Sequence, residues 1–170
     1  MGEIWKLNYA KIVKYDTINW DGINAAIFVS GCKFNCPGCF NKEAQAYNYG
    51  DKLTEQTLTD FIVHCQDPKV KGINILGGDL FWQDMIEAFD FLFRLYTEVK
   101  KPIRVWTGFT YEEIYKDKTR RPLLAMIDFL VDGRFEISKK DLNLLYRGSS
   151  NQRVIDVQDS LRLGEIVTII

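Results

Sequence analysis

Residues 22–41 read GINAAIFVSGCKFNCPGCFN, an apolar run that leads into three closely spaced cysteines. The first part, Gly22 to Val29, has the pattern of a buried strand. The cysteines follow with the spacing Cys-x3-Cys-x2-Cys, at Cys32, Cys36 and Cys39. Three thiolates this close in sequence converge readily on one metal centre. We therefore expect a metal-binding loop at the end of a buried strand.

The number of cysteines limits the kind of metal site. A structural zinc site takes four protein ligands, and a four-iron cluster normally takes four thiolates. With three, one iron keeps an open position for chemistry on a bound molecule. Two alternatives are a zinc site with a distant fourth ligand, and a redox dithiol at Cys36 and Cys39 that leaves Cys32 unexplained. The spare candidates for a fourth ligand are His64, which we expect at the surface, and Cys65, which falls on the apolar face of a predicted helix.

Length and charge narrow the class of protein. The 170 residues predict a single domain, residues 1–170, and the net charge of −1 gives no reason to expect a nucleic acid or an anionic membrane as partner. We see no signal peptide at the start of the chain, and no stretch approaches the ~18 apolar residues of a membrane span. Clustered cysteines then indicate metal ligands in a reduced protein. We expect a cytoplasmic protein.

Strand and helix patterns alternate along the chain. This alternation predicts an α/β fold with a parallel sheet and right-handed crossovers. Strands are predicted at 22–29, 72–76, 102–106 and 129–131, with a further edge strand at 7–15. Helices are predicted from Leu58, Phe61, Ile62 and Cys65, from Ile86, Phe89, Phe93 and Tyr96, and from a capping box at Thr110–Glu113.

Four short motifs each follow a predicted strand: the cysteine loop, Gly77-Gly78-Asp79, Thr107-Gly108 and Asp132-Gly133. Functional groups of parallel sheets lie at the carboxyl ends of the strands, so all four motifs should share one face. A full eight-unit barrel needs about 250 residues. This chain predicts a partial, open parallel β/α barrel, and an open side suits a large substrate such as a loop of another protein.

The cysteine spacing, followed at once by Phe40, resembles the signature of radical S-adenosylmethionine (radical SAM) enzymes. In that family the open iron is chelated by the amino and carboxylate groups of the methionine moiety. Gly77-Gly78-Asp79 resembles the family's Gly-Gly-Glu motif, which accepts hydrogen bonds from the methionine ammonium. Asp79 is shorter than Glu by about one C–C bond, ~1.5 Å, so the backbone carbonyls are the alternative contact.

Three further segments resemble one subgroup, the activating proteins of anaerobic ribonucleotide reductases. They are residues 146–156, YRGSSNQRVID, preceded by 128–135, DFLVDGRF, and the run Trp106-Thr-Gly-Phe-Thr110. The resemblance extends from Gly22 to Asp156. It implies that Cys32, Cys36 and Cys39 hold a [4Fe-4S] cluster, and that S-adenosylmethionine contacts Gly38, Cys39, Phe40, Gly77, Gly78, Asp79, Thr107, Asp132 and Arg147.

The resemblance also implies a mechanism, with no catalytic residue beyond cluster and cofactor. The reduced cluster donates one electron to S-adenosylmethionine, giving methionine and a 5′-deoxyadenosyl radical. That radical removes a hydrogen atom from a glycine Cα in the large subunit of the reductase, and a flavodoxin-like protein supplies the electron. Arg147 and Arg153 are candidates for holding the partner's loop or the cofactor carboxylate, or for fixing a surface loop to the sheet edge.

Three other functions remain open. One is an activase for another glycyl-radical enzyme, for which a longer chain and extra cluster cysteines are expected. The second is a small radical SAM enzyme that acts on a free metabolite. The third belongs to a different class, a zinc-binding adaptor module without catalysis. Reconstitution with iron and sulfide separates the zinc protein from the others.

Overall fold

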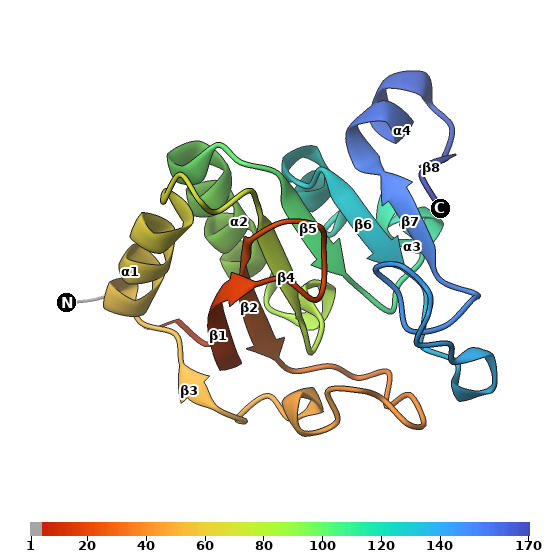
Figure 1. Cartoon of the computed structure of the whole chain (residues 1–170), viewed down its shortest axis with the longest axis horizontal. Helices are drawn as coiled ribbons and strands as arrows, with labels where there is room; N and C mark the ends of the chain where they lie inside the picture. The colour runs from red at the N-terminus through yellow and green to blue at the C-terminus, as the bar shows by residue number, and fades with distance from the viewer. Residues whose placement is uncertain (1–4) are drawn as a thin grey trace.

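A computed structural model describes residues 5–170 and places eight strands in one open sheet, in the order β3-β1-β2-β4-β5-β6-β7-β8 (Figure 1). The strands are β1 (Asn8–Asp16), β2 (Asn24–Ser30), β3 (Asp51–Lys52), β4 (Ile73–Gly77), β5 (Ile103–Trp106), β6 (Phe129–Asp132), β7 (Arg153–Asp156) and β8 (Val167–Thr168). The α-helices are α1 (Glu55–Cys65), α2 (Met85–Val99), α3 (Tyr111–Lys116) and α4 (Val157–Leu163). Short 3-10 helices are η1 (Glu43–Gln45), η2 (Leu80–Trp82), η3 (Arg121–Met126) and η4 (Ile137–Lys139).

The four predicted central strands are confirmed, and they are the parallel part of the sheet: β2, β4, β5 and β6. Both flanks are antiparallel, β1 and β3 on one side and β7 and β8 on the other. Parallel neighbours need a long crossover, whereas a short connection such as 17–23 returns the chain antiparallel. The strand predicted at 7–15 is β1, but β3 pairs outside it and forms the edge.

Helices cover one face of the sheet, where the main hydrophobic core lies. Ile27, Ile75 and Val105 point to this face and pack in one cluster with Phe61 of α1 and Phe91 of α2. The opposite face carries smaller apolar clusters, among them Phe28 and Leu76 with the partly buried Trp106. Alternate residues of each strand therefore build either the core or the wall of an open hollow.

Helix α2 is present as predicted, but the apolar stripe that indicated it faces solvent. Ile86 is 76% exposed, and Phe89, Phe93 and Tyr96 are exposed as well. The side that packs on the core consists of Ala88, Phe91, Leu92, Leu95 and Val99. The helix is apolar on both sides, so the spacing of one stripe predicts a helix without showing which side is buried.

Other local predictions are confirmed. Thr110 and Glu113 form the reciprocal capping box that begins α3. Cys65 is fully buried on α1, as expected for a small hydrophobe. His64 is partly exposed, and its Nε2 lies 2.6 Å from the carbonyl oxygen of Lys14.

The carboxyl ends of β2, β4, β5 and β6 lie along one edge of the sheet, and the segment from Gly31 to Gly50 runs beneath them (Figure 1). The four motifs predicted to share a face therefore do so. Within residues 5–170, no helix is long and apolar enough to cross a membrane.

Candidate metal centre

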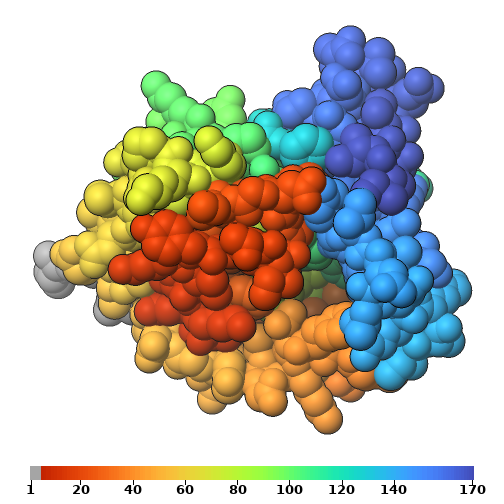
Figure 2. Space-filling model, viewed as in Figure 1, coloured from red at the N-terminus to blue at the C-terminus, as the bar shows by residue number. Residues whose placement is uncertain are grey.

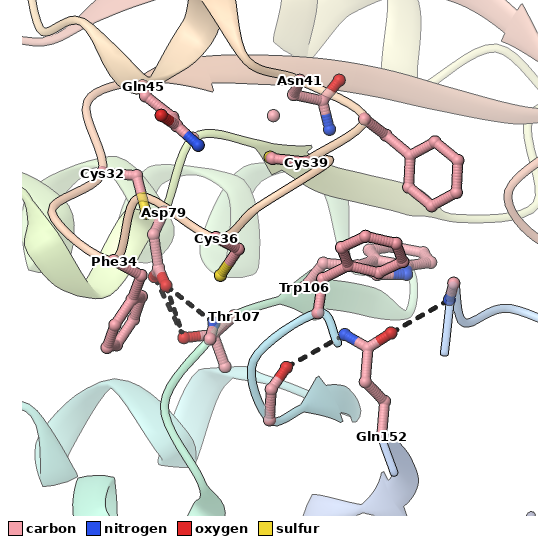
Figure 3. Close-up of a pocket in the computed structure, with 17 residues that line it drawn as sticks. Cys32, Phe34, Cys36, Cys39, Asn41, Gln45, Asp79, Trp106, Thr107 and Gln152 are labelled. Carbon is pink, nitrogen blue, oxygen red and sulfur yellow. Dashed lines mark hydrogen bonds between the residues drawn. The ribbon is translucent and has the colours of Figure 1, made fainter. Parts of the chain in front are cut away.

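One cavity collects the motifs that follow the parallel strands (Figure 3). Its wall includes the three cysteines of the loop after β2, the Gly77–Asp79 loop after β4, and Thr107 after β5. Gly133, which follows β6, also lines the cavity. Eight of the residues predicted for the metal and the cofactor line it together: Cys32, Cys36, Cys39, Phe40, Gly77, Gly78, Asp79 and Thr107.

Backbone contacts shape the cysteine loop. The amide of Gly31 donates to Ala44 O at 2.7 Å, and that of Cys32 donates to Gln45 O at 3.0 Å. A Cβ on Gly31 would lie 2.4 Å from the ring of Tyr47, and its φ of +111° is one that other residues rarely adopt. The loop thus folds back on its own continuation at η1, which turns the thiols toward the cavity.

Gly38, for which the resemblance implies a cofactor contact, occupies a tight turn beside η4. Its φ is +71°, and a Cβ there would lie 2.3 Å from Ile137 Cδ1. It turns the chain between Cys36 and Cys39 and packs against η4, outside the cavity wall. The structure therefore accounts for a glycine at this position without a cofactor contact.

All three loop cysteines are free thiols. Burial raises the pKa of Cys32 to about 12, and burial also raises the pKa of Cys36. Iron and zinc bind thiolates, so metal binding here must release protons. Cys65 lies away from the cavity on α1, where burial raises its pKa to about 12. In the part of the chain that the structure describes, no three His, Cys, Asp or Glu side chains are grouped as a site for one metal ion.

The carboxylate of Asp79 is buried at the edge of the cavity and is surrounded by donors. Its oxygens accept from Thr107 Oγ1 at 2.9 and 3.0 Å, from Gly108 N at 2.9 Å and from Phe81 N at 2.9 Å (Figure 3). Even so, burial raises the pKa of Asp79 to about 6. The side chain joins the ends of β4 and β5, and its lone pairs are largely taken by the protein.

Gly78 is needed for close packing between two loops. A Cβ there would lie 2.7 Å from Gly31 O and 2.9 Å from Ala44 O. The neighbouring amides continue this contact, since Gly78 N donates to Val29 O and Asp79 N donates to Gly31 O. A side chain at position 78 would therefore displace the cysteine loop itself, in addition to narrowing the cavity.

Gln83 was not singled out in the sequence, yet it ties the same two loops together. Its Nε2 donates to the carbonyl oxygens of Ser30, Gly31 and Asp79 at 3.0–3.1 Å. A glutamine five residues after Gly78 has no sequence signal of its own. Only the folded chain shows that its amide reaches the beginning of the cysteine loop.

Asp132 and Arg153 lie next to the cavity but are paired away from it. They are register partners on β6 and β7, and Arg153 Nη2 lies 2.5 Å from Asp132 Oδ2. Asp132 also accepts from Tyr111 N at 2.8 Å, while Arg153 reaches Glu112 at 2.7 Å. These contacts raise the pKa of Arg153 further above its ordinary value. The pair fixes α3 to the sheet edge, and Gly133 rather than Asp132 lines the cavity.

Arg147 lines a second, outer cavity that adjoins the first. The two cavities share Phe40, Asn41, Trp106 and Gly148. Figure 2 shows the surface hollowed between the red β1–β2 hairpin, the orange cysteine segment and the blue segment that precedes β7. Arg147 Nη1 donates to Gln152 O at 2.7 Å, so this side chain helps to fold its own segment.

Several cavity residues had no individual role predicted from the sequence. Gln152 was seen only as part of a polar run, but its amide spans the two walls, donating to Gly133 O and accepting from Gly148 N (Figure 3). The amides of Asn41 and Gln45 point toward the cavity near Cys39. Aromatic side chains complete the wall at Phe34, Trp106 and Phe135.

The donor set fits an iron–sulfur cluster. Three free thiols line one cavity, and the remaining cysteine is on a helix elsewhere. Polar side chains and glycine backbone beside the thiols leave contacts for a small polar cofactor. Thiolates are the ligands that Fe–S clusters require.

Comparison with known proteins agrees with this chemistry. Residues 18–155 match a family described as a 4Fe-4S single cluster domain. The chain is 36% identical over 152 residues to the anaerobic ribonucleoside-triphosphate reductase-activating protein of Escherichia coli K12, covering 87% of this chain and 97% of the relative. It is 35% identical over 150 residues to the protein of that name from Pasteurella multocida, covering 86% and 95%. The protein of that name from phage T4 is 29% identical over 153 residues, covering 87% and 93%. The chain therefore belongs to the anaerobic ribonucleoside-triphosphate reductase-activating proteins, a family with a single 4Fe-4S cluster domain.

Proposed function

We propose that this chain, a single radical SAM domain with a partial β/α barrel, activates an anaerobic ribonucleotide reductase by generating a glycyl radical on its large subunit. The observation that carries the proposal is the meeting of three free thiols with the Gly77–Asp79 loop in one cavity at the strand ends. When bound, a [4Fe-4S] cluster would supply the electron that cleaves S-adenosylmethionine to methionine and a 5′-deoxyadenosyl radical.

Different residues of the cavity would bind the cluster and the cofactor. Cys32, Cys36 and Cys39 would hold the cluster as thiolates. The backbone of the Gly77–Asp79 loop would accept from the methionine ammonium, because the Asp79 carboxylate is already engaged by Thr107 and Gly108. Thr107 would thus help to bind the cofactor indirectly, because its hydrogen bond to Asp79 holds the Gly77–Asp79 loop in place.

Uncharged side chains would orient the rest of the cofactor and keep water out. The amides of Asn41 and Gln45 can donate and accept beside the thiols. Phe40 contacts Phe135, with ring centroids 5.0 Å apart, and covers Gly148 closely, so this region can pack against a flat base. Orientation matters because the target hydrogen must lie close to the radical when it forms.

The outer cavity gives the protein substrate a route to the inner one. Its wall is mostly apolar, with Phe28, Leu76 and Trp106 from the face of the sheet opposite the helices. Ile18 and Leu142 are 90% and 77% exposed at this cavity. A flexible loop of the reductase would enter here and bring its glycine to the shared boundary.

A direct assay tests the proposed function. The chain is reconstituted with iron and sulfide without oxygen, reduced, and mixed with S-adenosylmethionine and the anaerobic reductase. We expect one 5′-deoxyadenosine for each glycyl radical, seen as a doublet by EPR. A reductase whose target glycine is replaced by alanine is the control. A protein that binds cluster and cofactor, gives no glycyl doublet and consumes cofactor with a free metabolite would contradict the proposal.

A further inference from the structure

Phe34, Trp82 and Phe109 form an aromatic cluster on the cysteine loop and its neighbours. Ring centroids are 5.5 Å apart for Phe34 and Trp82, 4.8 Å for Phe34 and Phe109, and 5.0 Å for Trp82 and Phe109. They come from three loops, those after β2, β4 and β5. Phe34 lies between Cys32 and Cys36 in sequence and also lines the inner cavity. The cluster therefore connects the protein surface with the metal-binding loop.

Three cations lie over these rings. Lys33 Nζ is 5.2 Å from the centroid of Trp82, and Arg134 Cζ is 4.6 Å from that of Phe34. Arg120 Cζ lies 4.6 Å from the centroid of Phe109 and 5.3 Å from that of Trp82. Aromatic faces attract cations, so the rings hold positive charge at this site.

Two of the three charges are not neutralised by the protein. Arg120 is paired with Asp117, and its Nε donates to Phe81 O. Lys33 and Arg134 are exposed, and neither forms an ion pair within residues 5–170. The whole chain carries a net charge of −1, so the positive charge here is a local concentration.

The reaction proposed above needs one electron from outside for each cofactor that is cleaved. The cofactor and the protein substrate would fill the inner and outer cavities. Neither cavity is lined by Lys33, Trp82, Phe109 or Arg134, so these side chains remain available to a reductant. Aromatic residues with arginine at their border are typical of the centre of a protein interface, and complementary charge speeds association.

We propose that Lys33, Arg134 and the aromatic cluster of Phe34, Trp82 and Phe109 form the docking surface for an acidic one-electron carrier protein. This inference rests on the proposed function. The carrier loses one electron and the cluster gains it, with no bond made or broken. Of the five residues of this surface, only Phe34 also lines the inner cavity, and none lines the outer one.

Stopped-flow reduction of the reconstituted holoprotein tests this surface, with reduced flavodoxin as the acidic probe. In the Lys33→Glu/Arg134→Glu double variant, we expect the second-order rate constant at low ionic strength to fall about tenfold or more. High salt should lower the rate constant of the wild type, so that the rate constants of wild type and double variant become similar. Lys69→Glu/Lys71→Glu is the matched control, because both lysines are exposed and precede β4 at the opposite end of the sheet.

Two further measurements separate the possible causes of a slower rate. Iron content and visible spectrum show whether the cluster is intact, and reduced methyl viologen, a small cation, should reduce the double variant at least as fast as wild type. An unchanged rate with flavodoxin, or an equal fall in the control variant, would overturn the docking surface. If methyl viologen reduces the wild-type cluster and no 5′-deoxyadenosine forms, the proposed function fails instead.

Discussion

Two buried aspartates lie at the carboxyl ends of β4 and β6, on either side of β5, and they have different hydrogen-bond partners. Asp79 and Asp132 are each 1% exposed. Asp79 accepts only from uncharged donors and borders the cavity with the thiols. Asp132 is paired with Arg153, its register partner on β7, and is absent from the cavity wall. The difference shows that two similar Gly/Asp motifs at strand ends can lie in different surroundings, because only Asp132 has an arginine opposite it on the neighbouring strand.

The largest expected effect concerns the three thiols that line the same cavity as Asp79. Replacing Cys32, Cys36 or Cys39 by alanine should abolish the iron-dependent visible absorbance after reconstitution, because each removes one of the three cavity thiols. Cys65→Ala should retain the absorbance, since Cys65 is buried on α1. Loss of the cluster in Cys65→Ala would show that the metal site extends beyond this side of the molecule.

On the other side, Asp132→Ala should mainly destabilise the fold. It leaves Tyr111 N without its side-chain acceptor and Arg153 with Glu112 as its one remaining carboxylate partner, and we expect the free energy of unfolding of the metal-free chain to fall by roughly 3 kcal/mol. Glu112→Ala removes the outer, half-exposed partner of Arg153 and should lower it by less than about 1 kcal/mol. Urea unfolding measures both. A stable Asp132→Ala protein that binds S-adenosylmethionine weakly would instead place Asp132 in the site.

The contribution of Asp79 to stability should decrease as pH rises, the opposite direction from a carboxylate whose pKa is lowered on folding. Its pKa is raised to about 6 in the folded protein, so its contribution is greatest below pH ~4 and is lost as pH rises through 6. The stability advantage of the metal-free wild type over Asp79→Asn should therefore shrink by on the order of 2 kcal/mol between pH 4 and 7. The control is Asp117→Asn: hydrogen bonds, chiefly from Thr119, lower the pKa of Asp117 to about 2, so its effect should stay level above pH ~5. If the stability advantage of wild type over Asp79→Asn stayed constant between pH 4 and 7, the raised pKa of Asp79 in the folded protein would be wrong.

The smallest expected effect is that of replacing Gln83, which tests whether the contact between the cysteine loop and the Gly77–Asp79 loop positions the cofactor. Gln83→Ala removes the amide that holds three carbonyl groups of the two loops, and should weaken S-adenosylmethionine binding several-fold, or roughly 1 kcal/mol. Iron content should stay normal. Gln66→Ala, which removes a single hydrogen bond to Glu98 O, is the matched control. Equal cofactor affinity in the two variants would show that Gln83 does not position the site.

The chain order of strands, helices and motifs was readable from local patterns. Apolar runs predicted β2, β4, β5 and β6, and the glycine-containing motifs after them predicted one functional edge. Local patterns suffice because parallel strands with crossovers place all their carboxyl ends together. The cysteine spacing by itself left a zinc site and a dithiol open, and its resemblance to a known family predicted the [4Fe-4S] cluster.

Contacts between side chains that are distant in sequence could not be predicted from local patterns and are visible only in the folded chain. Arg153 neutralises Asp132 because an antiparallel strand pairs them across 21 residues, and Thr107 reaches Asp79 from the next strand. The choice of which side of α2 is buried also depends on the sheet beneath it. Local sequence specified the cysteine loop and the edge on which it lies, while long-range register and packing specified which polar groups remain available to a cofactor.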